Sequence, residues 1–426
     1  MAYSDKKTVY SNEKPAYSDK KIAQSKGVPM KIESIQLKNF KSFRDMEMRN
    51  IPRFCVIVGA NGTGKSSLFS LFEFLKEAFS SNVHAALTKL GGSGGIKEVR
   101  SRGTSENILI VLKFREKPDS KLVTYSLEIG EDTDGRPVVE REVLKYRRGS
   151  GGQPWKFLDF KRGQGSAVTN EVDETTDYSK LEREEQSLKA PDILAVKGLA
   201  QFQRFPAVVA LGNLIENWHI SNFMIHRARP EQEAGYAEHL STEGENLSLV
   251  TEFLYHRHQK IFDQLCERLA RRIPGIDRVE AKTTEEGRVL LKFQDGSFQN
   301  PFLARYVSDG TIKMLAYLVL LLDPNPHSLL CVEEPENQLY PKLLWELAEE
   351  FRAYSHRGGQ VFVSTHSPDF LNATKLEEVF WLVKEKDGYT HIKRAKDDEQ
   401  LSAYMADGDQ MGYLWNQGFL DGADPE

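Results

Sequence analysis

The stretch that decides the fold is Gly59-Ala-Asn-Gly-Thr-Gly-Lys65-Ser66, which matches the pattern G-x-x-x-x-G-K-[ST] at every fixed position. A short apolar run with β-branched residues, 53–58, precedes it and predicts a strand. The apolar residues that follow keep helical spacing, namely Leu68, Leu71, Phe72, Leu75 and Phe79. Because strand, glycine-rich turn and helix follow one another, this segment predicts a phosphate-binding loop rather than an ordinary glycine turn.

Glycines in such a loop let consecutive backbone N–H groups point at phosphate oxygens. Lys65 is expected to add a positive charge at the β- and γ-phosphates, and the Ser66 hydroxyl to bind Mg²⁺. The following helix directs its positive end at the same anion. The predicted nucleotide-binding residues here are Gly59, Asn61, Gly62, Gly64, Lys65, Ser66 and Ser67.

A second segment, Leu329-Leu-Cys-Val332, reads as a buried strand that ends in the adjacent carboxylates Glu333 and Glu334. Ligands of parallel sheets bind at the carboxyl ends of the strands. Successive side chains diverge there, so Glu333 can hold Mg²⁺ while Glu334 polarises an attacking water. The alternative is a solvated acidic turn, since Pro335 and Glu336 follow directly. The phosphate-binding loop elsewhere in the chain favours the catalytic interpretation.

A third segment, 307–311, opens an apolar helix and contains Ser308 and Gly310. Ser308 has the character of an N-cap, so a capped core helix is one interpretation. A serine hydroxyl, glycine amides and a helix N-terminus also make a phosphate site. One nucleotide needs only one primary phosphate-binding loop. This second site is therefore expected to contact the ATP of another protomer.

His366 follows a short buried strand, Gln360 to Ser364. A lone histidine is more often structural. In company with the other three motifs, His366 is expected to sense the γ-phosphate or to orient water.

The 426 residues carry a net charge of −5, and the sequence pI is about 6.1, which argues against a protein that coats nucleic acid over its whole surface. The longest strong apolar run is 314–322, so an α-helical membrane span is not expected. The first 30 residues have no apolar core of a secretory signal. Three scattered cysteines exclude a disulfide framework and favour the cytoplasm.

Four regions are expected along the chain. The first, 1–29, repeats a polar unit at Tyr3, Tyr10 and Tyr17 and is predicted to be a disordered tail, with a docking peptide as the alternative. The remaining regions are an N-terminal lobe with the phosphate loop (30–135), an inserted middle region (136–300) and a C-terminal lobe (301–426). Alternating strands and helices around the loop predict an α/β fold with a mainly parallel sheet. Strands are predicted at 31–40, 108–114, 122–129 and 328–332, helices at 311–322 and 341–354, and a flexible glycine loop at 91–95.

The middle region holds a basic stretch followed by an acidic one. Residues 141–163 carry seven Lys/Arg and two acids with interleaved aromatics, and 171–185 carry seven acids and two bases. The basic stretch is either a DNA-contacting surface or, as we favour, a solvated loop paired with the acidic one. No sustained heptad occurs, so a long coiled-coil arm is not expected.

Together these motifs resemble the ABC-type ATPases of the RecF/SMC/OLD group over residues 30–90 and 300–426. Asn39-Phe40-Lys41-Ser42-Phe43 looks like that group's opening strand and turn. The segments 308–311 and 333–337 look like its short prokaryotic "predicted ATPase" branch, which often accompanies a nuclease-like effector in anti-phage defence. The resemblance implies an ABC-type ATPase head with a β-rich N-terminal lobe and an inserted α/β or helical middle region.

The resemblance also implies roles for single residues. It assigns phosphate and Mg²⁺ binding to Lys65 and Ser66, the metal-binding Walker B position to Glu333, the catalytic base to Glu334 and the switch to His366. Ser308 and Gly310 would make the signature contact in trans. The Walker B position usually holds Asp, so metal geometry can differ here. Tyr340 stands where relatives often have His, and no glutamine is assigned to the Q-loop.

The expected function is therefore ATP hydrolysis with Mg²⁺ by a homodimer or higher homo-oligomer that controls a partner effector in anti-phage defence. The alternative is a RecF-like DNA-maintenance ATPase coupled to DNA. OLD-type relatives add a nuclease domain after the switch histidine, but 60 residues follow His366. The nuclease is therefore expected in a partner protein.

Overall fold

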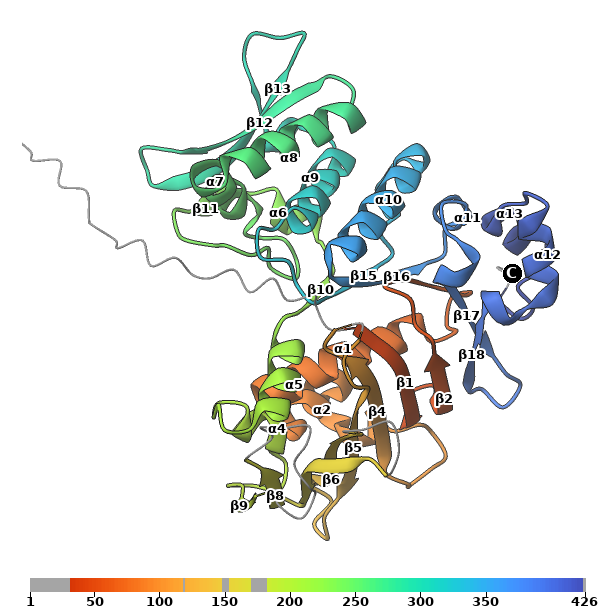
Figure 1. Cartoon of the computed structure of the whole chain (residues 1–426). Coiled ribbons are helices and arrows are strands. Elements are labelled where there is room, and N and C mark those ends of the chain that lie inside the picture. Colours follow the sequence, from red (N-terminus) through yellow and green to blue (C-terminus); the bar gives the residue numbers. More distant parts are fainter. Residues whose placement is uncertain (1–30, 118, 148–152, 170–181, 424–426) are drawn as a thin grey trace, which may run out of the picture.

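The computed structural model describes residues 31–117, 119–147, 153–169 and 182–423. The predicted tail, 1–29, lies outside the described residues. The described chain forms three sheets and the helices that cover them (Figure 1).

The central sheet has six strands and contains the strand before the phosphate loop. In spatial order these are β10 (Trp218–Ser221), β15 (Leu329–Glu333), β16 (Gln360–Thr365), β3 (Phe54–Val58), β17 (Val379–Lys384) and β18 (Thr390–Arg394). All neighbours pair in parallel except β17 and β18, which are antiparallel. This arrangement confirms the predicted mainly parallel sheet.

Strand β3 shows why this sheet is central. Its side chains alternate between two hydrophobic cores: Phe54, Val56 and Val58 enter one core, and Cys55 and Ile57 enter the other. A strand with apolar residues on both faces must be covered on both sides. Helix α1 (Lys65–Ser80) and the second sheet lie on one side of the central sheet, and helices α9 (Asp309–Leu321) and α10 (Pro341–Arg357) lie on the other (Figure 1).

The second sheet has eight antiparallel strands and forms the β-rich part of the fold. In spatial order it contains β2 (Phe43–Arg49), β1 (Lys31–Phe40), β4 (Ile108–Arg115), β5 (Val123–Glu131), β6 (Pro137–Tyr146), β7 (Trp155–Lys161), β8 (Gln164–Val168) and β9 (Arg183–Ser187). Strand β4 alternates buried and half-buried residues along its length, as a sheet with one covered face requires.

The third sheet and the helices around it belong to the hydrophobic core that Phe54, Val56 and Val58 of β3 enter. The sheet contains β11 (Gln232–Glu233), β12 (Ile276–Thr283), β13 (Arg288–Asp295) and β14 (Phe302–Leu303). The helices of the described chain are α1 (Lys65–Ser80), α2 (Val83–Gly91), α3 (Ile96–Val99), α4 (Ala195–Leu199), α5 (Pro206–Glu216), α6 (Ile225–Ala228), α7 (Leu247–Arg257), α8 (Gln259–Arg272), α9 (Asp309–Leu321), α10 (Pro341–Arg357), α11 (Pro368–Leu371), α12 (Glu399–Ala406) and α13 (Met411–Asn416). None of these described helices is long and apolar enough to cross a membrane.

Most predicted elements are confirmed within a few residues, and two are wrong. The basic stretch 141–163 was expected to be a solvated loop, but it forms most of β6 and β7. Its aromatics Phe157 and Phe160 are almost fully buried, so their burial overrides the local charge in deciding the structure. The glycine run expected to be a loop instead completes α2 and forms a 3₁₀ turn, Gly92–Gly94. Most of the acidic partner stretch, 171–181, lies outside the described residues.

The predicted limit between N-terminal lobe and middle region, at 135/136, falls inside one sheet, because β6 pairs with β5 along its whole length. The middle region also supplies β10, an edge strand of the central sheet. A hairpin brings consecutive antiparallel strands together whatever their charge, so composition does not mark this boundary. The four domain ranges stay predictions.

Candidate functional site

The predicted phosphate loop joins the end of β3 to the start of α1. Gly62 and Gly64 have φ values of 78° and 103°, in the left-handed region that favours glycine. A Cβ on Gly64 would lie 2.5 Å from the Ser42 hydroxyl, and a Cβ on Gly59 would lie 2.6 Å from that of Thr63. The loop conformation therefore requires glycine at these positions.

Lys65 starts α1 and is buried beneath the loop. Its Nζ donates hydrogen bonds to the backbone oxygens of Gly59 (2.7 Å) and Ala60 (3.2 Å). Burial lowers the pKa of the Lys65 ammonium, and the carboxylates of the β15 end oppose that shift. An anion bound at the loop would replace the two carbonyls as the partner of the Lys65 ammonium. The attraction between the two charges would offset the cost of burying the ammonium.

The predicted metal residues Ser66 and Glu333 are in direct contact. Ser66 Oγ donates a 2.8 Å hydrogen bond to Glu333 Oε2. Burial raises the pKa of the Glu333 carboxyl, the Ser66 hydrogen bond lowers it, and the neighbouring Glu73 raises it further. A hydroxyl and a carboxylate side by side fit Mg²⁺, which prefers oxygen ligands. A dication would also relieve the cost of a buried carboxylate.

Glu334 occupies a constrained turn directly after β15. Its φ is 44°, which is unusual for a residue other than glycine, and its backbone N–H donates to Ser364 O of β16 at 2.9 Å. Glu334 Oε2 accepts a 3.1 Å hydrogen bond from Asn337 Nδ2, and Oε1 lies 3.4 Å from His366 Nδ1. Backbone and side-chain contacts thus fix this carboxylate beside His366.

Glu336 is a site residue that the sequence analysis did not assign. Its Oε1 accepts hydrogen bonds from the Thr365 hydroxyl and the His366 backbone N–H, both at 2.8 Å. The same oxygen lies 3.3 Å from His366 Nδ1, and the carboxylate is 8% exposed. Its buried Oε2 has no hydrogen-bond partner among the described residues. The signal in the sequence was a third acid, two positions after Glu334, which looked like part of a solvated turn.

Two further predicted residues, Asn61 and Ser67, lie in and just after the loop. Asn61 is exposed between β3 and α1, and Ser67 is half-buried in the first turn of α1. The structure thus brings together the predicted phosphate loop, both acids after β15 and His366, which come from three neighbouring strand ends.

Ser308 and Gly310 lie at the start of α9 and line a cavity of about 740 Å³. The Ser308 hydroxyl accepts a 3.2 Å hydrogen bond from Thr311 N, so Ser308 is an N-cap. A Cβ on Gly310 would lie 2.9 Å from Gln338 O. Among the described lining residues are Arg271 and Arg272, and none comes from the loop 59–67. Within one chain, Ser308 and Gly310 therefore line a cavity to which the phosphate loop contributes no residue.

Lys313 connects α9 to the turn after β15 and was also missed by the sequence analysis. Its Nζ donates a 2.6 Å hydrogen bond to Asn337 O, and burial lowers the pKa of its ammonium to about 8. The apolar sequence around it reads as an ordinary core helix. Only the packing of α9 on the central sheet reveals that a cation meets the turn that carries Glu334.

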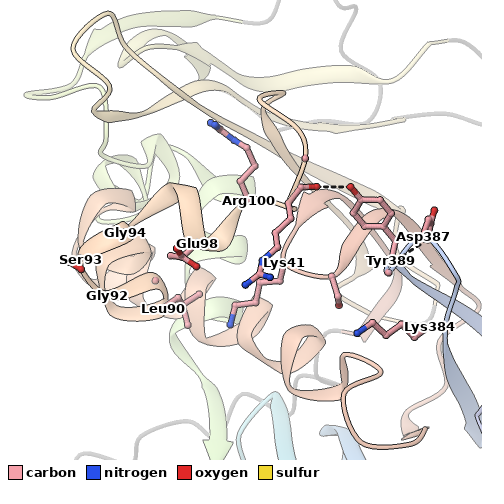
Figure 2. A pocket seen from close by; sticks show the side chains of 15 residues that line it. Lys41, Leu90, Gly92, Ser93, Gly94, Glu98, Arg100, Lys384, Asp387 and Tyr389 are labelled. Atoms are coloured by element: carbon pink, nitrogen blue, oxygen red, sulfur yellow. Dashed lines mark hydrogen bonds between the residues drawn. The ribbon is translucent and has the colours of Figure 1, made fainter.

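A basic cavity of about 1120 Å³ adjoins the phosphate loop (Figure 2). Four cationic side chains from three segments line it: Lys41, Arg100, Arg102 and Lys384. Ser42 also lines it and abuts Gly64 of the loop. Thr390 N donates to Ser42 O at 2.9 Å, and Thr390 Oγ1 donates to Thr63 O at 2.8 Å. Through these two hydrogen bonds, β18 connects the wall of the cavity to the phosphate loop.

Solved structures with a similar fold are SMC head domains. The chain aligns with an SMC head bound to the C-terminal winged-helix domain of ScpA with a TM-score of 0.53 and 14% identity, covering 85% of this chain and 97% of that one. It aligns with an SMC head domain carrying an extended coiled coil, bound to the C-terminal domain of ScpA from Pyrococcus furiosus, with a TM-score of 0.52 and 12% identity, covering 88% of this chain and 100% of that one. The predicted fold of an ABC-type ATPase head is confirmed.

A curated relative is the DNA replication and repair protein RecF of Heliobacterium modesticaldum, 22% identical over 151 residues. The match covers 34% of this chain and 40% of that protein's length. A family model described as "AAA domain, putative AbiEii toxin, Type IV TA system" matches residues 54–372, which span the phosphate loop, both acids and His366. The chain therefore belongs to this AbiEii-type family of AAA-domain ATPases.

Proposed function

We propose that this protein binds ATP with Mg²⁺ at the carboxyl edge of the central sheet and hydrolyses it. The observation that carries the proposal is the 2.8 Å contact between Ser66 and Glu333, with Lys65 buried beneath the same loop. A hydroxyl, a carboxylate and an ammonium at one phosphate loop are the groups needed to hold a metal-bound triphosphate. Membership of an ATPase family supports the same activity.

In this mechanism the loop amides and Lys65 bind the β- and γ-phosphates. Ser66 and Glu333 would hold Mg²⁺, which supplies neutralisation of the phosphate charge when bound. The adjoining basic cavity, with Lys41 and Lys384, has the charge and the volume to receive the rest of the nucleotide. The nucleotide would thus lie across the junction of the loop and the β1–β2 turn.

Glu334 is the proposed general base. It accepts the proton of the attacking water as the water oxygen bonds to the γ-phosphorus and the bond to the ADP oxygen breaks. Asn337 and His366 lie at hydrogen-bonding or near hydrogen-bonding distance and orient the Glu334 carboxylate. Glu336 positions His366 by accepting its backbone N–H. His366 is then placed to respond to the γ-phosphate.

The proposal includes a head-to-tail homodimer, in which Ser308 and Gly310 of one copy close over the ATP of the other. Within one chain, the cavity that Ser308 and Gly310 line contains no residue of the phosphate loop, which supports a contact in trans. The Ser308 hydroxyl and the N-terminus of α9 offer donors and positive potential to a phosphate. ATP binding would join two copies and hydrolysis would part them.

The proposed biological role is control of a partner effector of the nuclease-like class in prokaryotic anti-phage defence, in the cytoplasm. The toxin named in the family description and the resemblance to defence-linked ATPases support this role. Three buried free cysteines suit a reducing compartment. The motion of two heads would be the signal that reaches the effector.

A second candidate is a RecF-like ATPase coupled to DNA. The match to RecF and the basic cavity favour it. However, the burial of Phe157 and Phe160 removes two aromatics that base stacking would need on the stretch 141–163. We therefore place effector control first.

One set of measurements separates these candidates. The purified full-length chain is tested for ATP hydrolysis with and without duplex DNA, and for its mass in solution with and without a non-hydrolysable ATP analogue. We expect ATP-dependent dimers and a hydrolysis rate that DNA leaves unchanged. Stimulation by DNA that weakens steeply with salt would favour the second candidate. A chain that stays monomeric at saturating nucleotide would contradict the proposal that two copies share each ATP site.

A further inference from the structure

A cluster of histidines and an aspartate lies at the edge of the central sheet, outside the nucleotide site. One ligand atom each from His239, Asp323 and His327 lies within 4.8 Å of the others. His239 comes from the segment between β11 and α7, and the other two come from the connection between α9 and β15. His239 Nδ1 lies 2.7 Å from Asp323 Oδ2. Two imidazoles and a carboxylate are ligands that Zn²⁺ prefers in proteins.

Burial sets this cluster apart from an ordinary surface ion pair. The Asp323 side chain is 3% exposed, and the neighbouring His219 of β10 is 4% exposed. His219 Nε2 and His327 Nε2 are buried and have no hydrogen-bond partner among the described residues. A buried polar atom without a partner is costly, so these two nitrogens need an explanation.

Two of the histidine rings lie against each other. The ring of His327 stacks on that of His219 with centroids 4.8 Å apart. An unprotonated imidazole nitrogen has a lone pair to offer a cation.

Outer contacts orient the cluster. A hydrogen bond with the backbone of Asn217 ties the His327 ring to the residue before β10. Asn325 N donates to Asp323 Oδ1 at 2.8 Å and leaves Oδ2 directed at His239. Metal-binding histidines and carboxylates are typically held by such second contacts.

The cluster is distant from the nucleotide site. His327 precedes β15 and Glu333 ends it, and β10 pairs with the beginning of β15 through His219 and Leu330. Six residues of extended chain separate the two ends by about 20 Å. A cation at the cluster is therefore a different ion from the one at Ser66 and Glu333.

We propose that His239, Asp323 and His327 form a site for a dication of the Zn²⁺ class. Three protein ligands leave a fourth position, which faces a cavity of about 710 Å³ that His219, His239 and His327 line. Ligand atoms on a tetrahedral Zn²⁺ lie about 3.4 Å apart. On binding, separations of up to 4.8 Å in the cluster would shorten, and the 2.7 Å between His239 Nδ1 and Asp323 Oδ2 would lengthen. The ion fastens the segment before α7 to the edge of the central sheet.

The test is a calorimetric titration of the metal-free full-length chain with Zn²⁺ alone, in buffer with excess Mg²⁺ to occupy oxygen-ligand sites. We expect one high-affinity Zn²⁺ per chain. His239→Ala changes the most exposed ligand and so affects folding least, and it should weaken binding at least about tenfold. Asp323→Asn should do the same. The matched control is His256→Ala, on the exposed face of α7, which should bind as the unaltered chain does.

The second readout is the visible absorption spectrum of the Co²⁺-substituted protein. A tetrahedral site with nitrogen and oxygen ligands gives a strong spectrum that His239→Ala removes and His256→Ala keeps. Circular dichroism of each variant verifies that it is folded. Absence of tight Zn²⁺ binding by the unaltered chain, or equal affinity in all three variants, overturns the proposal. Neither readout depends on ATP hydrolysis.

Discussion

Ser66 Oγ donates a 2.8 Å hydrogen bond to Glu333 Oε2, although 267 positions separate the two residues in the chain. The contact arises because β3 and β15 both pair with β16 in parallel, so their carboxyl ends meet at one edge. The loop after β3 carries Ser66, and Glu333 ends β15. This pair makes the edge of the sheet a place where a hydroxyl and a carboxylate can share one cation.

Lys65→Ala should abolish useful ATP binding. The variant removes a buried ammonium that is positioned by Gly59 O and Ala60 O. A hydrogen bond to a charged group is worth about 1.5–3 kcal/mol, so affinity should fall by about 10- to 100-fold or more. Titration with a fluorescent ATP analogue measures the change. Lys282→Ala, on exposed β12, is the control and should bind normally. If Lys65→Ala bound ATP with unchanged affinity, the loop would not be the ATP-binding site.

Glu334→Gln should keep ATP binding and lose hydrolysis. Gln preserves the side-chain shape in the turn where φ is 44° but cannot accept the proton from water. Loss of a general base costs about 10²–10⁴-fold in rate. The variant should also accumulate as a dimer with ATP bound, which light scattering would detect. Glu285→Gln, exposed on the third-sheet side, serves as control. Hydrolysis by Glu334→Gln at the unaltered rate would show that another group is the base.

Ser308→Asp should block ATP-driven dimerisation without unfolding the protein. Aspartate caps a helix as well as serine does, so the bond to Thr311 N is retained. Its negative charge would repel the phosphates of the opposite copy. Ser308→Asn keeps both the cap and neutrality, and it should dimerise far better than Ser308→Asp. Dimerisation is followed by sedimentation with a non-hydrolysable analogue. Equal dimerisation of the two variants would refute the contact in trans.

Glu142 should make stability depend on pH. It is fully buried and accepts hydrogen bonds from Tyr125, Ala195 N and Val196 N. Burial raises its pKa from 4.5 to about 7, and these hydrogen bonds partly oppose the rise. The folded state thus binds the proton more tightly than the unfolded state. The stability from this carboxyl is fully present below about pH 4.5 and lost as pH rises through about 7.

The change should be on the order of 3 kcal/mol across that window. The free energy of unfolding is measured with denaturant for the unaltered chain and for Glu142→Gln at several pH values. The difference between the two curves gives the pH-dependent contribution of Glu142. Glu142→Gln is expected to be less stable, since its amide cannot accept from both backbone donors, but its own stability should lack this pH dependence. Parallel pH curves for the two proteins would contradict the assignment.

Local patterns predicted the parts of the site that lie within one segment. The strand, glycine turn and helix around Lys65 are contiguous, so their spacing alone predicts a phosphate loop. The apolar strand that ends in Glu333 and Glu334 is also contiguous. Ser308 as an N-cap follows from its place before the helix, and the structure confirms that cap. These features depend on periodicity and turn chemistry, which act over a few residues.

Other features arise only when distant segments pack together. Glu336 looked like part of a solvated turn until β16 brought Thr365 and His366 against it. The stretch 141–163 looked like a charged loop, yet it pairs into a sheet that buries Phe157 and Phe160. The sequence alone thus determined the phosphate loop, the acidic strand end and the mainly parallel sheet. Tertiary structure decided which side chains share a cavity, because strand pairing and burial join residues hundreds of positions apart, where no local pattern reaches.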